Sequence, residues 1–76
     1  MKKFIPGIYR HYKGKKYLAL GIAKHSETLE KLVIYISLYE NETSQMWARP
    51  LDMFMEGVEI EGKNQPRFKF IEDSID

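Results

Sequence analysis

Two histidines and one carboxylate form a group that could support metal or acid–base chemistry. His25 and Glu27 stand two positions apart, with the hydroxyls of Ser26 and Thr28 beside them, and His11 lies earlier in the chain. Two imidazoles and a carboxylate can hold a transition metal, and they can also act as general acid and base. The same spacing is typical of a polar turn that these side chains brace by hydrogen bonds, and we favour this structural interpretation.

A second stretch alternates aromatic rings with cations, in the order Tyr9-Arg10-His11-Tyr12-Lys13-Gly14-Lys15-Lys16-Tyr17. Rings that stack on bases and cations that neutralise phosphates together make a platform for single-stranded nucleic acid. The alternative is an ordinary amphipathic hairpin, whose tyrosines half-bury their rings and whose lysines keep an edge strand soluble. We favour the ordinary hairpin and keep nucleic-acid binding as the alternative.

A third group combines aromatic residues with two of the three arginines of the chain: Tyr35, Trp47, Arg49 and Arg67. Guanidinium groups bind carboxylates or phosphates bidentately and stack on rings, so these residues could form a pocket for an anionic ligand or a peptide terminus. They could also line an aromatic groove for an extended peptide. In the structural alternative, which is the favoured of the two, Trp47 lies in the core and the arginines pair with carboxylates of the fold, namely Glu27, Glu40, Asp52 or Glu56.

The chain is short, with 76 residues, 12 lysines and arginines, 11 acidic residues and no cysteine. We expect one domain over residues 1–76, with a packed part at about 7–71 and a frayed acidic tail at 72–76, because domains rarely contain fewer than about 50 residues. So small a domain has few ways to enclose a catalytic cleft, which makes an enzyme the least favoured class. No cofactor motif is present, and we expect neither a cofactor nor a bound metal.

The lack of cysteine excludes disulfides, thiolate metal sites and cysteine nucleophiles. Secreted domains of this size usually depend on disulfides, so we expect a cytoplasmic protein. Pro6 and Gly7 interrupt the apolar start of the chain, which does not fit a signal peptide. No apolar run approaches the roughly 18 residues of a membrane helix, so we expect no membrane contact.

Charge is distributed unevenly behind a net value of +1. Residues 1–24 hold seven cations and no acid, whereas residues 25–76 hold five cations and all eleven acids. Such a chain can present a basic face although its overall charge is close to zero.

Alternation with a period of two dominates the hydrophobic pattern and predicts strands. Along residues 17–23, Leu18, Leu20 and Ile22 are expected on one face, and the small residues Ala19, Gly21 and Ala23 on the other. Residues 32–39 are apolar on both faces, which predicts a central strand. Residues 13–15 form a tight turn in which Gly14 supplies a positive φ, with a loop of two or three residues.

Shorter strands are expected at residues 8–12, 46–49, 58–60 and 67–71, with polar turns at 25–30 and 41–44. Pro50 suits the first position of a short helical turn that extends to Met55 and presents Leu51, Phe54 and Met55 on one side. Five or six short strands in so short a chain must pair their edges, which predicts a small SH3-like antiparallel barrel.

Several short motifs together resemble one family of small bacterial domains. The resemblance runs from about residue 7 to 70 and rests on Gly7, Tyr9-Arg10-His11-Tyr12-Lys13-Gly14, Tyr17, Ala23, His25-Ser26-Glu27-Thr28, Val33, Tyr35, Leu38-Tyr39, Trp47, Arg49-Pro50, Met53-Phe54 and Pro66-Arg67-Phe68. The chain is similar to the bacterial family of domains of unknown function numbered 1653, which implies an SH3-like barrel and brings no activity. Ile36 departs from the family pattern, because a long polar residue is expected there, and it adds an apolar spot if it faces outward.

These observations favour a small binding module over an enzyme. The leading hypothesis is a protein or peptide partner bound by the aromatic and arginine residues Tyr35, Trp47, Arg49 and Arg67. The alternative is single-stranded nucleic acid or a ribonucleoprotein bound by the hairpin at residues 9–17. A third hypothesis is a metal- or histidine-dependent enzyme built on His11, His25 and Glu27.

Overall fold

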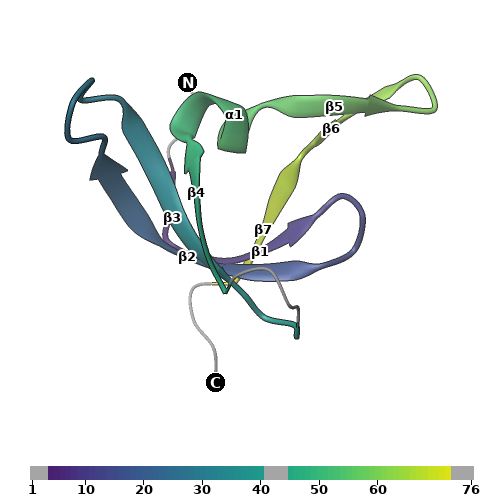
Figure 1. Ribbon diagram of the computed structural model, residues 1–76. Coiled ribbons are helices and arrows are strands. Elements are labelled where there is room, and N and C mark those ends of the chain that lie inside the picture. Colours follow the sequence, from purple (N-terminus) through teal and green to yellow (C-terminus); the bar gives the residue numbers. More distant parts are fainter. Residues whose placement is uncertain (1–3, 41–44, 73–76) are drawn as a thin grey trace.

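The computed structural model describes residues 4–40 and 45–72, and most of them lie in short strands (Figure 1). In chain order the elements are β1 (Gly7–His11), β2 (Lys16–Lys24), β3 (Lys31–Ser37), β4 (Met46–Pro50), α1 (Leu51–Met55), β5 (Gly57–Ile60), β6 (Lys63–Pro66) and β7 (Phe68–Glu72). The predicted mainly β fold and the short helix after Pro50 are confirmed. The first three residues, the predicted turn at 41–44 and residues 73–76 of the predicted tail lie outside the described residues, whereas Glu72, the first residue of that predicted tail, lies in β7.

The strands form two antiparallel sheets. Five of them pair in the order β4-β3-β2-β1-β7, and β5 pairs with β6 in a separate hairpin that projects from the body (Figure 1). The described residues contain seven strands instead of five or six. The additional strand is β6, which is polar and fully exposed and therefore lacks the alternation that predicts a strand. Within residues 4–40 and 45–72 no pairing joins β4 to β7, so a closed barrel is not observed.

The core lies between the inner face of the five-stranded sheet and α1. Directly opposed residues of antiparallel strands point to the same face, so the pairs Tyr9–Tyr17, Ala19–Tyr35 and Tyr35–Trp47 place these side chains on one face. Phe54 of α1 is 1% exposed and packs onto that face. The buried cluster comprises Tyr9, Ala19, Val33, Tyr35, Phe54 and Phe68.

The expected alternation along β2 fails at one point. The pairing of β2 with β3 shifts between Ala19 and Gly21, so a bulge inserts Leu20 and reverses the faces beyond it. Ala19 is 1% exposed, whereas Leu20 is 49% and Ile22 is 45% exposed. The prediction that Leu18, Leu20 and Ile22 share one face is therefore wrong, because a bulge breaks the period of two.

The first hairpin turns through three residues. The His11 N–H donates to the Lys15 carbonyl at 2.8 Å, and the Gly14 N–H donates to the His11 carbonyl at 2.7 Å. Gly14 has φ +108°, so the predicted positive φ is confirmed. This turn places His11 and Tyr17 at the end of the sheet where the candidate site lies. No helix in the described part of the chain has the length and apolar character to cross a membrane.

Candidate functional site

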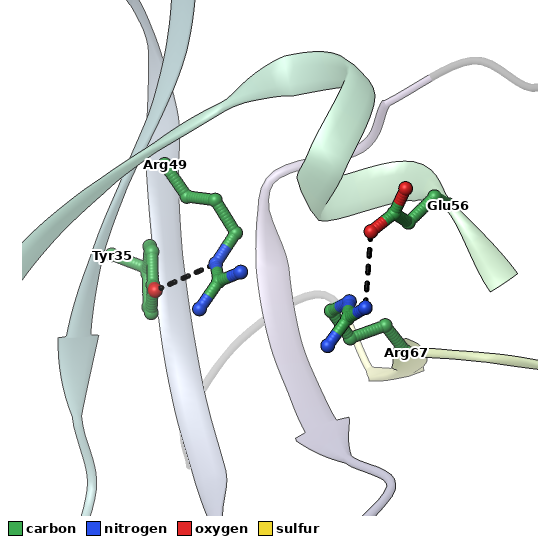
Figure 2. A network of polar contacts seen from close by, with 4 residues as sticks. All are labelled: Tyr35, Arg49, Glu56 and Arg67. Carbon is green, nitrogen blue, oxygen red and sulfur yellow. Dashed lines mark hydrogen bonds and ion pairs between the residues drawn. The ribbon is translucent and has the colours of Figure 1, made fainter. Parts of the chain in front are cut away.

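The guanidinium of Arg49 is the centre of the candidate site. Its Nε donates a hydrogen bond to the Tyr35 hydroxyl at 3.3 Å (Figure 2), and its Cζ lies 5.6 Å from the centroid of the Phe68 ring. Within residues 4–40 and 45–72 no carboxylate lies within ion-pair distance of Arg49. The hydrogen bond of Arg49 in this part of the chain is made by Nε, so Nη1 and Nη2 have no hydrogen-bond partner among these residues.

Arg67 lies across from Arg49 and is tied to the end of α1 (Figure 2). Its Nη2 lies 3.0 Å from Glu56 Oε1, and its backbone N–H donates to the Glu56 carbonyl at 3.1 Å. Its Nε is buried and has no hydrogen-bond partner. The structural alternative of internal pairing thus holds for Arg67 with Glu56, whereas Arg49 binds a tyrosine hydroxyl in place of a carboxylate.

Phe68 and the rings around it form an aromatic floor under Arg49. The Phe68 ring meets Tyr17, Tyr35 and His11 edge-on at centroid distances of 5.7, 5.6 and 4.9 Å, and it stacks on Phe54 at 4.2 Å. A ring face attracts a guanidinium electrostatically, and the attraction strengthens where water is excluded. The floor therefore holds Arg49 in place without neutralising its charge.

Tyr17 and Tyr39 close one side of this floor. Their hydroxyl oxygens are 2.7 Å apart and share a hydrogen bond. Burial, followed by the hydrogen bond from Tyr39, raises the pKa of Tyr17 well above its usual value. The Tyr17 hydroxyl is therefore neutral at every physiological pH and adds no negative charge beside Arg49. Lys15 lies over the Tyr39 ring, with Nζ 4.9 Å from its centroid.

His11 is a neutral imidazole at the edge of the site. Burial, then the positive charges of Arg49, Arg67 and Lys13, lower the pKa of His11 below its ordinary value. Its Nδ1 accepts a hydrogen bond from the Lys13 backbone N–H at 3.2 Å, which places the proton of the neutral ring on Nε2. His11 thus offers a hydrogen-bond donor next to two fixed positive charges.

Trp47 lies beside the site and is only partly buried. It is half-buried against the core, opposite Tyr35 on the neighbouring strand. Its indole Nε1–H donates to Ser37 Oγ at 2.7 Å. Because that donor is already used, Trp47 contributes ring surface.

The structure divides the basic-aromatic hairpin between the two faces of the sheet. Tyr9 is 4% exposed, donates its hydroxyl proton to the Ile5 carbonyl at 2.6 Å and cannot stack on a base. Arg10 is exposed on the opposite face, and Tyr12 and Lys13 lie exposed in the turn. Ile36 also lies on that outer face, opposite Leu18 and Met46.

His25 and Glu27 do not join the site. The Nδ1 of His25 accepts hydrogen bonds from the backbone N–H groups of Glu27 at 3.1 Å and Thr28 at 3.3 Å, so His25 braces its own turn, as the structural interpretation holds. His11 lies at the other end of β2, whose nine residues put the two imidazoles roughly 25 Å apart at the usual strand rise. Among the residues with assigned structure, no cluster of His, Asp and Glu could hold a metal ion.

Three residues of the site escaped the sequence analysis as site members: Glu56, Phe68 and Tyr39. Phe68 stands in an alternating apolar run that predicts a strand but does not say which strand lies beside it. Its contact with Arg49 depends on the pairing of β7 with β1, which joins the two ends of the chain.

The fold and this set of residues define a small all-β domain with a cationic, aromatic-floored site. The model of the family described as a protein of unknown function, DUF1653, matches residues 7–70, and the chain belongs to this family. It is similar to the crystal structure of a DUF1653 protein from Bordetella bronchiseptica, with 45% sequence identity and a TM-score of 0.87 over 93% of this chain and 91% of that one. A comparison with curated proteins found no match.

Proposed function

We propose that this protein is a small cytoplasmic binding module that holds a carboxylate of a protein or peptide partner at Arg49. The observation that carries the proposal is the position of Arg49, which lies over Phe68 and whose Nη groups have no partner within residues 4–40 and 45–72. An SH3-like arrangement of the strands, with the ligand laid across the inner face, is part of this proposal.

The hydrogen bond to Tyr35 determines which edge of Arg49 a ligand meets. Because Nε is used, Nη1 and Nη2 are left, and this pair of donors matches the two oxygens of one carboxylate. His11 and Arg49 both lie against the Phe68 ring, and Arg67 lies across from Arg49 (Figure 2). A peptide carboxylate would therefore accept two hydrogen bonds from the Arg49 guanidinium, with Arg67 and the His11 Nε2–H as further donors.

An apolar hollow beside the site suits a neighbouring side chain of the same peptide. It has a volume of about 300 Å³ and is lined mainly by Tyr9, Met55, Phe68 and Phe70. Phe68 belongs to both the hollow and the floor under Arg49. Pockets for side chains beside an anchored main chain are how small β domains gain specificity for extended peptides. We propose no reaction, because His11, His25 and Glu27 do not meet.

The test is an amide NMR titration with pairs of heptapeptides that contain one apolar residue beside either Glu or Gln. The Glu peptide is expected to shift residues around Arg49 and to bind about tenfold or more tightly than its Gln counterpart, because hydrogen bonds to charged groups contribute about 1.5–3 kcal/mol. Arg49→Gln should abolish that difference. Arg10→Gln removes the same charge from the outer face and should leave it intact. Equal binding of both peptides would contradict the proposal.

A further inference from the structure

A row of three cations crosses the outer face of the sheet, away from the Arg49 site. Arg10 of β1 lies directly opposite Lys16 of β2 on one side and Lys69 of β7 on the other. Directly opposed residues share a face and have Cα atoms about 4.5–5.5 Å apart, so the three charges fall within roughly 10 Å. All three side chains are exposed. We call them the outer basic row.

No carboxylate of the described residues neutralises the charges of the outer basic row. Like charges placed directly opposite each other on a sheet are destabilising, and none of the three forms an ion pair with a carboxylate in the part of the chain with assigned structure. Lys13 lies exposed in the adjoining turn and adds to the positive charge near the row. Such an arrangement favours a ligand that carries several negative charges in succession.

A hollow at the edge of the sheet brings an exposed ring to the same cations. Arg10, Lys69, Phe70 and Ile71 line this hollow, which has a volume of about 290 Å³. Phe70 is 36% exposed and is supported from behind by Tyr9, whose ring centroid lies 5.4 Å away. A ring held by one neighbour and open on another side can stack on a planar ligand group.

We propose that the outer basic row and Phe70 bind single-stranded nucleic acid. Successive phosphates meet Lys16, Arg10 and Lys69, one on each strand, and a base enters the hollow and stacks on Phe70. The exposed ring beside the cations favours a nucleic acid over an acidic peptide, because each nucleotide supplies both a phosphate and a planar base. Phe70 also lines the hollow beside the Arg49 site, whereas the three cations lie on the other face of the sheet from Arg49. The surface is built by β7 as well as by the hairpin of β1 and β2.

The test measures the binding of a fluorescein-labelled ten-nucleotide oligothymidine by anisotropy between 25 and 200 mM NaCl, on the order of the salt range that resolves phosphate contacts. Three phosphate contacts predict that log K falls with log salt with a slope of about −2, and Arg10→Gln/Lys69→Gln should reduce that slope to about −0.7. Phe70→Leu keeps an apolar side chain in place and should weaken binding about fivefold or more through the loss of stacking.

The matched control is Lys24→Gln/Lys31→Gln. These two lysines are also directly opposed and exposed, but they lie at the far end of β2, so the control removes the same charge from another place. It should leave affinity within about twofold, as should Arg49→Gln. The proposal is overturned if the control weakens binding as much as the test variant, if the oligonucleotide does not bind at 25 mM salt, or if a poly-glutamate peptide of equal charge competes as well as unlabelled oligothymidine. Amide spectra of every variant establish that it is folded.

Discussion

Arg49 and Phe68 meet although their strands are the two outer strands of the five-stranded sheet, β4 and β7. The 5.6 Å between the Arg49 Cζ and the Phe68 ring centroid requires the sheet to curl until side chains from its opposite edges come together. The site exists only when the whole sheet is formed. Loss of either edge should therefore remove ligand binding together with native structure.

Tyr35→Phe removes the hydroxyl that orients Arg49 and keeps the ring in the core. Carboxylate-peptide affinity should fall about three- to tenfold, because the guanidinium loses the hydrogen bond that fixes its free edge. The measurement is the titration with the Glu heptapeptide. Tyr17→Phe is the matched control, since it removes a hydroxyl that binds Tyr39 and not Arg49, and its affinity should stay near that of the parent. Equal losses in both variants would contradict an orienting role for Tyr35.

The His11 imidazole should report the arrival of an anion. The nearby charges of Arg49 and Arg67 help to lower the pKa of His11, so a carboxylate that binds them should raise it. The measurement follows the His11 ring protons by NMR across pH, with and without the Glu heptapeptide. The His25 ring signals serve as an internal reference, because that residue braces a turn at the other end of β2. An unchanged His11 titration at saturating peptide would place the ligand elsewhere.

The lowered pKa of His11 also predicts how stability changes with pH. The folded protein binds the proton less readily than the unfolded chain does, whose histidine titrates near 6.5. His11 therefore leaves the free energy of unfolding unaffected above about pH 6.5. It lowers that free energy as the pH falls from there through the pKa of His11 in the folded protein. His11→Gln should flatten this part of the curve of unfolding free energy against pH, measured by urea denaturation. A slope that survives in the variant would assign the effect to other groups.

Leu29 occupies a backbone conformation that suits glycine. It has φ +63° and closes the turn after β2 by donating its N–H to the His25 carbonyl at 2.8 Å. A residue with a side chain in the left-handed conformation costs about 1–2 kcal/mol of stability. Glycine avoids this cost, but it gives back part of the gain because its unfolded chain has more conformational freedom. Leu29→Gly should raise the free energy of unfolding by about 0.5–1 kcal/mol, measured by thermal denaturation. Ser26→Gly, in the same turn with negative φ, should instead lose stability.

Phe54 is the side chain through which α1 seals the core. It stacks on Phe68 and meets the Tyr9 ring edge-on, so Phe54→Ala should cost about 3–5 kcal/mol. That is most of the stability expected of a chain this short. Met53→Ala, one residue away on the exposed side of the helix, should change stability by less than about 0.5 kcal/mol. Urea unfolding followed by Trp47 fluorescence measures both, and similar losses would show that α1 does not pack as described.

Local pattern predicted the parts of the fold that depend on near neighbours. The alternating residues of β3 and the proline before α1 are examples, because each acts within one element. The local sequence pattern gave a wrong prediction at two places. A bulge at Leu20 reverses the faces of β2, and β6 pairs polar residues without an apolar face. Neither feature has a signal in single-residue preferences.

The candidate site was predicted only in part, because residue types can be read from the sequence and long-range strand pairing cannot. Arg49, Arg67, Tyr35 and Trp47 were grouped by residue type, and the structure brings them to one end of the inner face. The sequence could not say that β7 pairs with β1, and this long-range pairing supplies Phe68 under Arg49 and Lys69 beside Arg10. His11 and His25 were grouped by residue type as well, but nine residues of extended strand separate them.

The base of the β5–β6 hairpin includes Arg67, a residue of the candidate site. The hairpin projects from the body (Figure 1), and its two ends are fastened to each other where Glu56 meets Arg67 through a side-chain ion pair and a backbone hydrogen bond. A ligand that competes with Glu56 for Arg67 would replace the ion pair at the base of the hairpin and leave the backbone hydrogen bond. We therefore expect a spectroscopic label on the exposed tip, at Glu61, to report ligand binding.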